Sequence, residues 1–310
     1  MLQTSGLQFT ARVGELPSDL FSVVGFTLTE RLSELFHGRL ELASTDPSID
    51  ASELLEQSVD LVVWQDGTPL RRFTGVVNEY ARGDTGHRRT CYELIIQPPL
   101  WRLGLMHNSR IFQTQATDTI VRTLLEERGI VNSVFDLKRA PQKREYCVQH
   151  RESDLAFVER LAGEEGWHYR FEHGSEQPGL ILADHHGDAP RLEAAEYNGK
   201  AGGSTKQPAV FRFRYEERVR AASVATKDYT FKNPSYALMH ERSAASASQR
   251  QDYQHFDYPA VSKPTPAVSR LPKQGWMPSE TTPALPTAKV TVQTLPAAPK
   301  PNLPSTTTPA

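Results

Sequence analysis

The sequence predicts a protein of the α+β class that is mainly β, with a short α/β insert between two β-rich regions. Three observations predict this class. Apolar and polar residues alternate along most of residues 20–97, which is typical of half-buried strands. Two segments within residues 101–166 carry apolar residues at helical spacing instead. Alternation then returns from residue 167 onward.

The first β-rich region is predicted to hold a strand pair followed by a β-meander. Asp66 and Gly67 form the hairpin turn of the meander, because both residues tolerate positive φ. We expect the next turn at 83–86 and a short helical turn at 52–56. Pro98 ends the meander, because proline cannot donate to a strand ladder. The predicted strands are 21–30, 35–43, 59–65, 70–80 and 89–97, the last with Tyr92, Leu94 and Ile96 on one face.

The α/β insert is predicted to contain two helices and two short strands. Gly129 ends the first helix, and Ser153 caps the start of the second through its side-chain oxygen. Gly166 ends the second helix, because glycine adopts the left-handed conformation readily. The buried helix faces carry Ile120, Val121, Leu124 and Leu125 in the first helix and Leu155, Val158, Leu161 and Ala162 in the second. The short strands are expected near 134–137 and 146–149.

The second β-rich region opens with Trp167, Tyr169 and Phe171, which point to one side of a strand. Its predicted strands are 167–172, 180–183, 209–216, 221–228 and 253–258, with a flexible connector at 199–208. Residues 261–310 hold 11 of the 22 prolines and almost no aliphatic periodicity. We therefore expect a disordered or extended tail from residue 261.

Several short sequence motifs follow one another along the chain. An acidic residue, serine and aspartate precede an apolar helix that ends in Glu-Glu-Gly and leads into an aromatic strand. The residues of all the motifs are Trp101, Ser109, Arg110, Phe112, Gln113, Glu152, Ser153, Asp154, Gly166, Asp184, Asp228, Tyr229, Pro234, Tyr258 and Pro259. Over about residues 15–260, this order resembles the N-terminal region of the VgrG family, the valine-glycine repeat spike proteins of type VI secretion. We expect these residues to be mostly structural.

The resemblance implies a fold like that of phage tail hubs, with two β-barrel-like domains flanking the α/β insert. The implied domains are 1–100, 101–166 and 167–260, followed by the tail 261–310. It also implies a homotrimer whose ring of barrels matches the hexameric tube protein, which is Hcp in secretion systems. Such a hub adapts the sixfold tube to the threefold spike. Baseplate, effector or adaptor proteins are further implied partners. The resemblance implies that the protein contacts a membrane only as part of the assembled injection machine.

The sequence departs from the family pattern after Pro259. Family members continue into an oligonucleotide-binding-like barrel and a β-helical needle, whereas here Ala260 and the proline-rich segment follow. Three explanations stay open: a natural stand-alone hub, a truncated product, or a hub whose tail docks an effector or adaptor.

Composition excludes several classes of protein. The formal net charge of −2 gives no reason to expect nucleic acid or an anionic membrane as a partner. No apolar run reaches the roughly 18 residues of a membrane span, and Met1–Thr10 lacks the pattern of a signal peptide. We expect the protein in the cytoplasm before firing and outside the cell as part of the spike afterwards. Cys91 and Cys147 lie in strand-like apolar settings and are expected to be buried free thiols.

Candidate chemistry is weak. The densest set of potential metal ligands is His173, Asp184, His185, His186 and Asp188. Adjacent histidines of an extended segment point to opposite faces, so that a polar turn explains these residues better than a metal site. Glu164 and Glu165 could serve a glycosidase, yet in the last turn of a helix they are predicted to be solvated. We predict no catalytic residues, no metal and no cofactor.

Three functions follow from these observations. The first is a structural hub of a type VI secretion spike that is not an enzyme. The second is the hub of a phage or phage-like contractile tail. The third is a cell-wall hydrolase that uses the carboxylates or histidines above.

Overall fold

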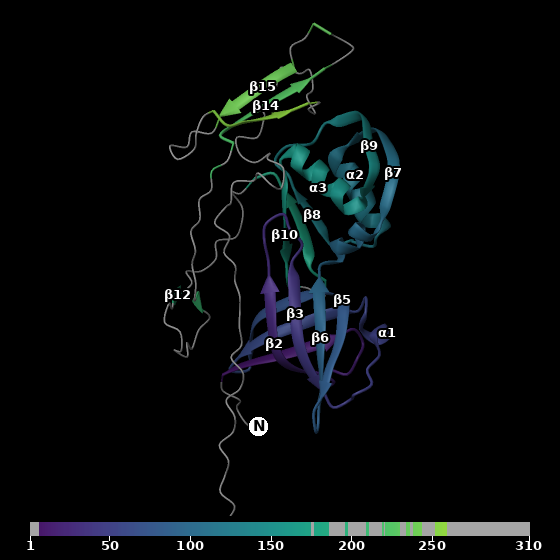
Figure 1. Cartoon of the computed structure of the whole chain (residues 1–310), viewed down its shortest axis with the longest axis vertical. Coiled ribbons are helices and arrows are strands. Elements are labelled where there is room, and N and C mark those ends of the chain that lie inside the picture. The colour runs from purple at the N-terminus through teal and green to yellow at the C-terminus, as the bar shows by residue number, and fades with distance from the viewer. Residues whose placement is uncertain are drawn as a thin grey trace, which may run out of the picture.

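The computed structural model places three bodies in order along one long axis: the first β-rich region, the insert together with the two strands that follow it, and a later three-stranded sheet (Figure 1). The described residues are 6–174, 177–185, 219, 221–229, 234–235, 238–243 and 252–258, together with the backbone of 196–197 and 209–210. The predicted connector 199–208, the tail 261–310, most of the predicted strand 209–216, His186 and Pro259 lie outside the described residues.

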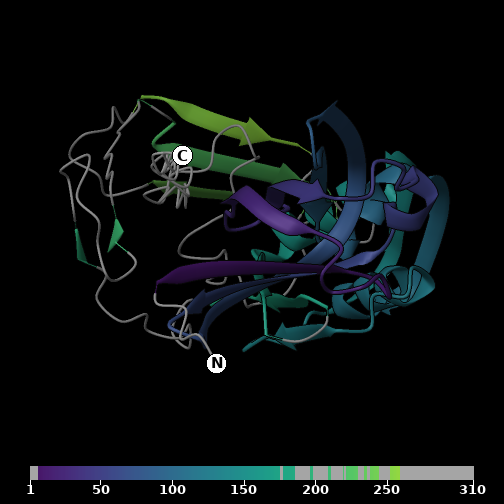
Figure 2. The ribbon, with the colours of Figure 1, turned by 90° about the horizontal axis from the view of Figure 1, so that it is seen from below.

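The first region is a six-stranded antiparallel sheet of order β1-β4-β5-β6-β3-β2. Its elements are β1 Leu7–Val13, β2 Ser22–Thr29, β3 His37–Ser44, α1 Ala51–Leu54, β4 Ser58–Gln65, β5 Thr68–Thr85 and β6 Thr90–Gln97. The sheet curls until its outer strands meet, with the rings of Phe9 on β1 and Phe26 on β2 at 5.5 Å (Figure 2). The result is a barrel-like body with one apolar core.

Most of the predicted elements of this region are confirmed. Asp66 and Gly67 adopt φ of 50° and 80°, and Tyr92, Leu94 and Ile96 are buried in the barrel core. The turn predicted at 83–86 is wrong, because β5 continues to Thr85 and the chain reverses between Gly86 and Arg89. β1 was not predicted, although its apolar alternation is present in the sequence.

The insert and the two strands after it share a second apolar core. The elements are η1 Pro99–Leu105, β7 His107–Ala116, α2 Thr117–Glu127, β8 Ser133–Asp136, β9 Lys143–Ser153, α3 Asp154–Glu165, β10 His168–Glu172 and β11 Gly179–Ala183. β7 pairs antiparallel with β9, whereas β10 pairs antiparallel with β11, which lies parallel to β8. The segments 167–172 and 180–183 thus share a sheet with a strand of the insert.

Both predicted helices of the insert are confirmed, and so is the buried side of the strand after them, where Trp167, directly before β10, and Tyr169 on β10 are almost fully buried. β7 was not predicted, because its sequence mixes polar residues on both faces. The start and end of α3 follow the predicted local signals. The Ser153 hydroxyl accepts the backbone N–H of Ala156 at 3.1 Å, and Gly166 adopts φ 73°.

We expect Gly166→Ala to lower the free energy of unfolding by roughly 1–2 kcal/mol, because a Cβ is disfavoured at positive φ. Urea denaturation measures this cost. Gly86→Ala is the control: a Cβ there meets only the Arg89 carbonyl oxygen at 3.5 Å, an ordinary contact, and its φ is not positive. Equal effects of the two substitutions would contradict a left-handed requirement at Gly166.

The third region contains a three-stranded sheet of order β15-β14-β16, with β14 antiparallel to β15 and parallel to β16. Its strands are β14 Ser223–Asp228, β15 Leu238–Ser243 and β16 Gln254–Asp257, and β12 Glu196–Tyr197 pairs with β13 Ala209–Val210 as backbone. The predicted strands 221–228 and 253–258 are confirmed, whereas β15 was not predicted. The α+β, mainly β class is confirmed.

The two cysteines differ in exposure. Cys147 is buried as predicted, and burial raises the pKa of its thiol. The prediction for Cys91 is wrong, because Cys91 is exposed. Strand alternation explains the difference: Tyr92, Leu94 and Ile96 face the barrel core, so their neighbour Cys91 points outward.

Among the described residues, no helix is long and apolar enough to cross a membrane.

Candidate assembly sites

A polar and aromatic joint fixes the insert against the barrel. His173 follows β10 and lies between the rings of Phe36 and Phe73, whose centroids are 4.9 and 5.5 Å from its own. Its Nδ1 accepts the backbone N–H of Thr74 at 3.1 Å, and its Nε2 lies 2.9 Å from a carboxylate oxygen of Glu30. Nδ1 also lies 3.2 Å from the carbonyl oxygen of Thr74, and Nε2 faces the Glu30 carboxylate, to which a ring N–H donates. The joint therefore spans three elements far apart in sequence.

The ionisation of Glu30 is coupled to this joint. Burial raises the pKa of Glu30. The hydrogen bond and charge of His173 and the charge of Arg71 together lower it by more than burial raises it, so that the pKa lies below its ordinary value. A lowered carboxyl pKa contributes stability above the unfolded-state pKa, and this contribution is lost as the pH falls through the folded-state pKa.

We expect the stability difference between wild type and Glu30→Gln to be largest near pH 7 and to shrink as the pH falls from about 5 to about 3. Urea unfolding at pH 3.5, 5 and 7 measures the difference. Glu53→Gln, at an exposed carboxylate of α1, is the matched control. A difference for Glu30→Gln that does not change with pH would exclude the coupling.

A buried ionic network holds the start of α3. The side chain of Asp154 is 0% exposed, and its carboxylate accepts from Arg110 at 3.0 Å and from Gln149 at 2.8 Å through one oxygen. Arg128 reaches the other oxygen at 3.4 Å. Arg110 also contacts Glu127 of α2 at 2.7 Å. Two motif residues, Arg110 and Asp154, thus join β7, β9, α2 and α3.

The other motif residues have separate local roles. The ring of Phe112 stacks on Phe157 at 5.8 Å, and Glu152 contacts Arg160 at 2.7 Å. The Ser109 hydroxyl accepts the N–H of Arg151 at 3.2 Å. Gln113 and Pro234 are exposed, and Trp101 is half-buried. Gln149 and Arg128 were missed, because nothing in their local sequence distinguishes them from surface residues.

Arg144 forms a second cluster, which corrects the prediction for Glu164 and Glu165. Arg144 is 8% exposed and contacts Glu164 through one nitrogen and Glu165 through another at 2.7 Å. Its Nε donates to the hydroxyl of Thr117 at 3.0 Å. The carboxylates are therefore largely buried in ion pairs rather than solvated, and they tie the end of α3 to β9 and to the start of α2.

The proposed metal ligands do not converge. His173 lies in the joint described above, whereas Asp184 follows β11 and accepts the backbone N–H groups of Lys138 and Arg139 at 2.9 and 3.1 Å. His185 lies 3.2 Å from Asp184. Within the described part of the chain, no group of three or more His, Cys, Asp or Glu side chains is placed to hold a metal ion.

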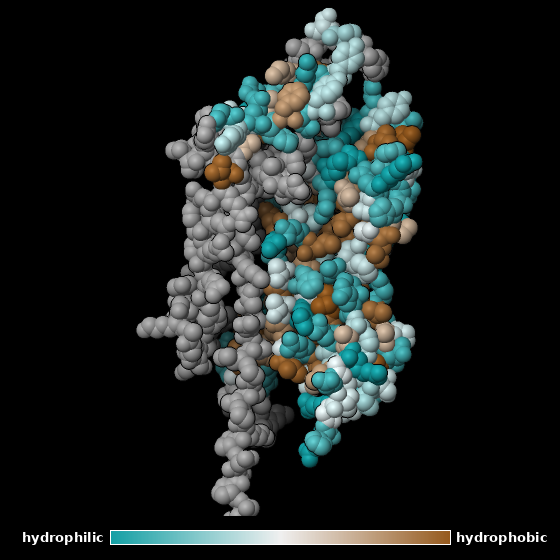
Figure 3. All heavy atoms as spheres, viewed as in Figure 1, coloured by the Kyte–Doolittle hydropathy of each residue, from teal (hydrophilic) through white to brown (hydrophobic). Residues whose placement is uncertain are grey.

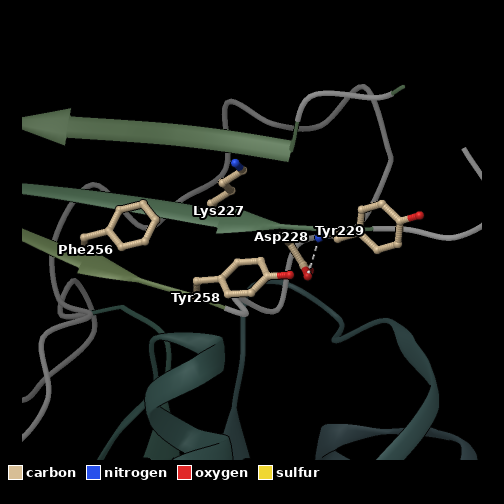
Figure 4. A pocket seen from close by; sticks show the side chains of 5 residues that line it. All are labelled: Lys227, Asp228, Tyr229, Phe256 and Tyr258. Atoms are coloured by element: carbon tan, nitrogen blue, oxygen red, sulfur yellow. Dashed lines mark hydrogen bonds between the residues drawn. The ribbon is translucent and has the colours of Figure 1, made fainter. Parts of the chain in front are cut away.

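The described residues form two exposed apolar surfaces that the contacts above do not cover. Figure 3 shows apolar atoms over the part of the insert where β7 and β9 lie, and Ile111, Tyr146 and Val148 are 65%, 68% and 46% exposed on this pair. The second surface is an open pocket of about 390 Å³ on the β14–β16 sheet (Figure 4). It is lined by Lys227, Asp228, Tyr229, Phe256 and Tyr258, of which Asp228, Tyr229 and Tyr258 belong to the motifs.

The sequence profile of the family described as phage tail baseplate hub (GPD) matches residues 29–294. The chain belongs to this family. The core of the insert, most of the barrel core, the joint and the two ionic clusters lie within the match.

Two similar relatives are spike proteins of type VI secretion. The chain is 36% identical over 264 residues to the spike protein VgrG3 of Vibrio cholerae, covering 82% of this chain and 26% of the relative. It is 37% identical over 256 residues to the spike protein VgrG2b of Pseudomonas aeruginosa, covering 82% and 25%. The predicted resemblance to the VgrG family is confirmed. The chain spans about a quarter of the length of these relatives.

Solved structures agree on the hub fold. The E. coli c3393 protein, described as a component of the type VI secretion system, superposes with a TM-score of 0.53 at 26% identity, covering 58% of this chain and 50% of that one. A tail protein from Neisseria meningitidis superposes with a TM-score of 0.56 at 13% identity, covering 82% and 72%. The latter shows likeness of fold alone.

Proposed function

We propose that the chain acts as the structural hub of a type VI secretion tail spike. The observation that carries the proposal is the identity of 36–37% to named spike proteins across 82% of this chain, in a region that matches the hub profile. One relative at 35% identity is named an actin cross-linking toxin, and the chain spans 24% of it. For this chain we propose no enzymatic activity, since Glu164 and Glu165, the carboxylate pair considered for a hydrolase, form ion pairs with Arg144.

In the proposed assembly, three copies form a ring that caps the hexameric tube and leads into a threefold spike. Closed rotational symmetry of this kind repeats one interface around the ring. The apolar surface on β7–β9 is of the kind that marks contacts between proteins, because soluble proteins rarely leave such patches uncovered. Baseplate, effector and adaptor proteins are further candidates for this surface.

The proposed location follows from the proposed machine. The hub assembles in the cytoplasm and leaves the cell with the spike when the machine fires. The division into domains 1–100, 101–166, 167–260 and the tail 261–310 stays a prediction.

Light scattering of the purified chain, combined with co-sedimentation on assembled tube protein, tests the function. We expect a mass near three times 34.7 kDa and retention by the hexameric tube. A Tyr146→Lys/Val148→Lys variant tests whether the β7–β9 surface takes part, because both side chains are exposed and their replacement leaves the core intact. A chain that stays monomeric at high concentration and does not bind the tube would contradict the hub function.

A hub of a phage-like contractile tail is the second candidate, and the name of the matching family favours it. The same co-sedimentation assay separates the two candidates when it is run with tube proteins of both machines. Preference for the phage tube would overturn the type VI assignment and keep the hub role.

A further inference from the structure

One face of the β14–β16 sheet carries a row of exposed aromatic side chains. Parallel pairing places Ala225 opposite Phe256 and continues so that Lys227 lies level with Tyr258. Antiparallel pairing places Met239 opposite Lys227 on the same face. The exposed fractions of the large residues on this face are 55% for Met239, 55% for Phe256, 56% for Tyr258 and 59% for Tyr229.

The face is hollowed rather than flat. The side chains of Lys227, Asp228, Tyr229, Phe256 and Tyr258 surround an open space of about 390 Å³, whereas Ala225 at the centre of the sheet is 0% exposed. Figure 4 shows Phe256, Tyr258 and Tyr229 following one another along the strands around the open pocket. Residues two apart on a strand are about 6.6 Å apart, so the three rings occupy successive levels over about 13 Å.

Such a row of rings matches the chemistry of polyproline II recognition. Grooves lined by aromatic residues bind P-x-x-P segments, because proline rings stack on the side chains and the segment is already extended. A polyproline II helix rises about 3.1 Å per residue, so the prolines of P-x-x-P lie about 9 Å apart, within the length of the row. Its backbone carbonyl groups have no internal partners, and the tyrosine hydroxyls and the Lys227 ammonium are donors at the rim.

The chain itself carries suitable segments directly after this sheet. P-x-x-P occurs at 283–286, 296–299 and 301–304, and the last two lie within Leu295–Pro304. Thirty-seven residues separate Tyr258 from Pro296. A segment of this length can span far more than the length of the row. Because the proline-rich segment is tethered to the same chain, its effective concentration at the pocket exceeds that of a free peptide, and a weak contact is enough for binding.

We propose that the aromatic pocket on β14–β16 binds the proline-rich segment Leu295–Pro304 of this same chain in the polyproline II conformation. The proposal depends on this face and this segment, and it does not depend on the hub function. Proline-rich segments of the same chemistry in other proteins compete for the pocket.

Methyl NMR of the full chain tests the proposal, because Met239 lies on the face beside the aromatic rings and is one of only 4 methionines. The tail variant Pro296→Ala/Pro299→Ala/Pro301→Ala/Pro304→Ala leaves every described residue unchanged. We expect its Met239 methyl resonance to differ from that of the wild type, while the Met106 resonance, from a residue after η1, stays in place. A synthetic peptide of residues 294–305 then moves the Met239 resonance of the variant back toward the wild-type position.

Competition gives the quantitative expectation. Because the tail of the wild type occupies the pocket, the peptide needs about a tenfold higher concentration to affect the wild type than the tail variant. In a Phe256→Ala/Tyr258→Ala chain carrying the same four tail substitutions, the peptide produces no shift at Met239. Identical Met239 resonances in wild type and tail variant, with no response to the peptide, would overturn the proposal. So would a Met239 shift that depends only on protein concentration, which would assign the face to a second copy.

Discussion

We expect Asp154→Asn to lower the free energy of unfolding by about 3 kcal/mol, because it leaves two guanidinium groups facing a neutral amide in a buried site. Breaking a buried ion pair costs about 3–5 kcal/mol. The lower end applies because Arg110 and Arg128 keep 22% and 28% of their side-chain surface exposed and regain some hydration. Urea denaturation followed by circular dichroism measures the loss.

Asp84→Asn is the control for this experiment, since it makes the same chemical change at an exposed position of β5. We expect it to change stability by less than about 0.5 kcal/mol. If the two variants unfolded at the same denaturant concentration, Asp154 would not be a stabilising centre of the insert. The motif residues Arg110 and Asp154 would then need another explanation.

Arg144→Met is expected to cost about 3–4 kcal/mol at neutral pH, because it leaves Glu164 and Glu165 close together and largely buried at the end of α3. The negative end of the helix dipole adds to the repulsion. Methionine retains much of the apolar volume of arginine, so that the lost ion pairs dominate the result. Thermal and urea unfolding both measure this change.

A rescue variant separates charge from packing at this cluster. Arg144→Met/Glu164→Gln/Glu165→Gln removes the unpaired carboxylates, and we expect it to recover at least half of the stability lost in Arg144→Met. Arg88→Met, on the exposed turn after β5, is the control for the arginine replacement itself. Failure of the triple variant to recover stability would indicate that Arg144 acts through packing and not through its charge.

Local patterns predicted the elements whose signals lie within one segment. The serine cap and terminal glycine of α3 act on neighbouring backbone groups, so Ser153 and Gly166 could be identified from the sequence. The alternation of Tyr92, Leu94 and Ile96 likewise reports which face of β6 is buried. β7 and β15 escaped detection, because strands with polar residues on both faces lack a clear period.

Local sequence patterns could not predict the two ionic clusters. Glu164 and Glu165 look like solvated charges at the end of a helix, and only the fold brings Arg144, about 20 residues earlier, between them and Thr117. The local sequence around a charged helix residue does not show which side chain of another element will pack against it. The prediction of solvated carboxylates therefore failed for a physical reason.

The sequence by itself determined the family, the mainly β class, both helices of the insert and their ends, because these depend on residue order, periodicity and local capping. Only the tertiary structure decided which polar residues became structural centres. His173 illustrates the difference: in the sequence it is a possible metal ligand, whereas in the fold it joins Glu30 and Thr74, 143 and 99 residues away. Contacts over such separations arise from the packing of barrel against insert, which no local spacing encodes.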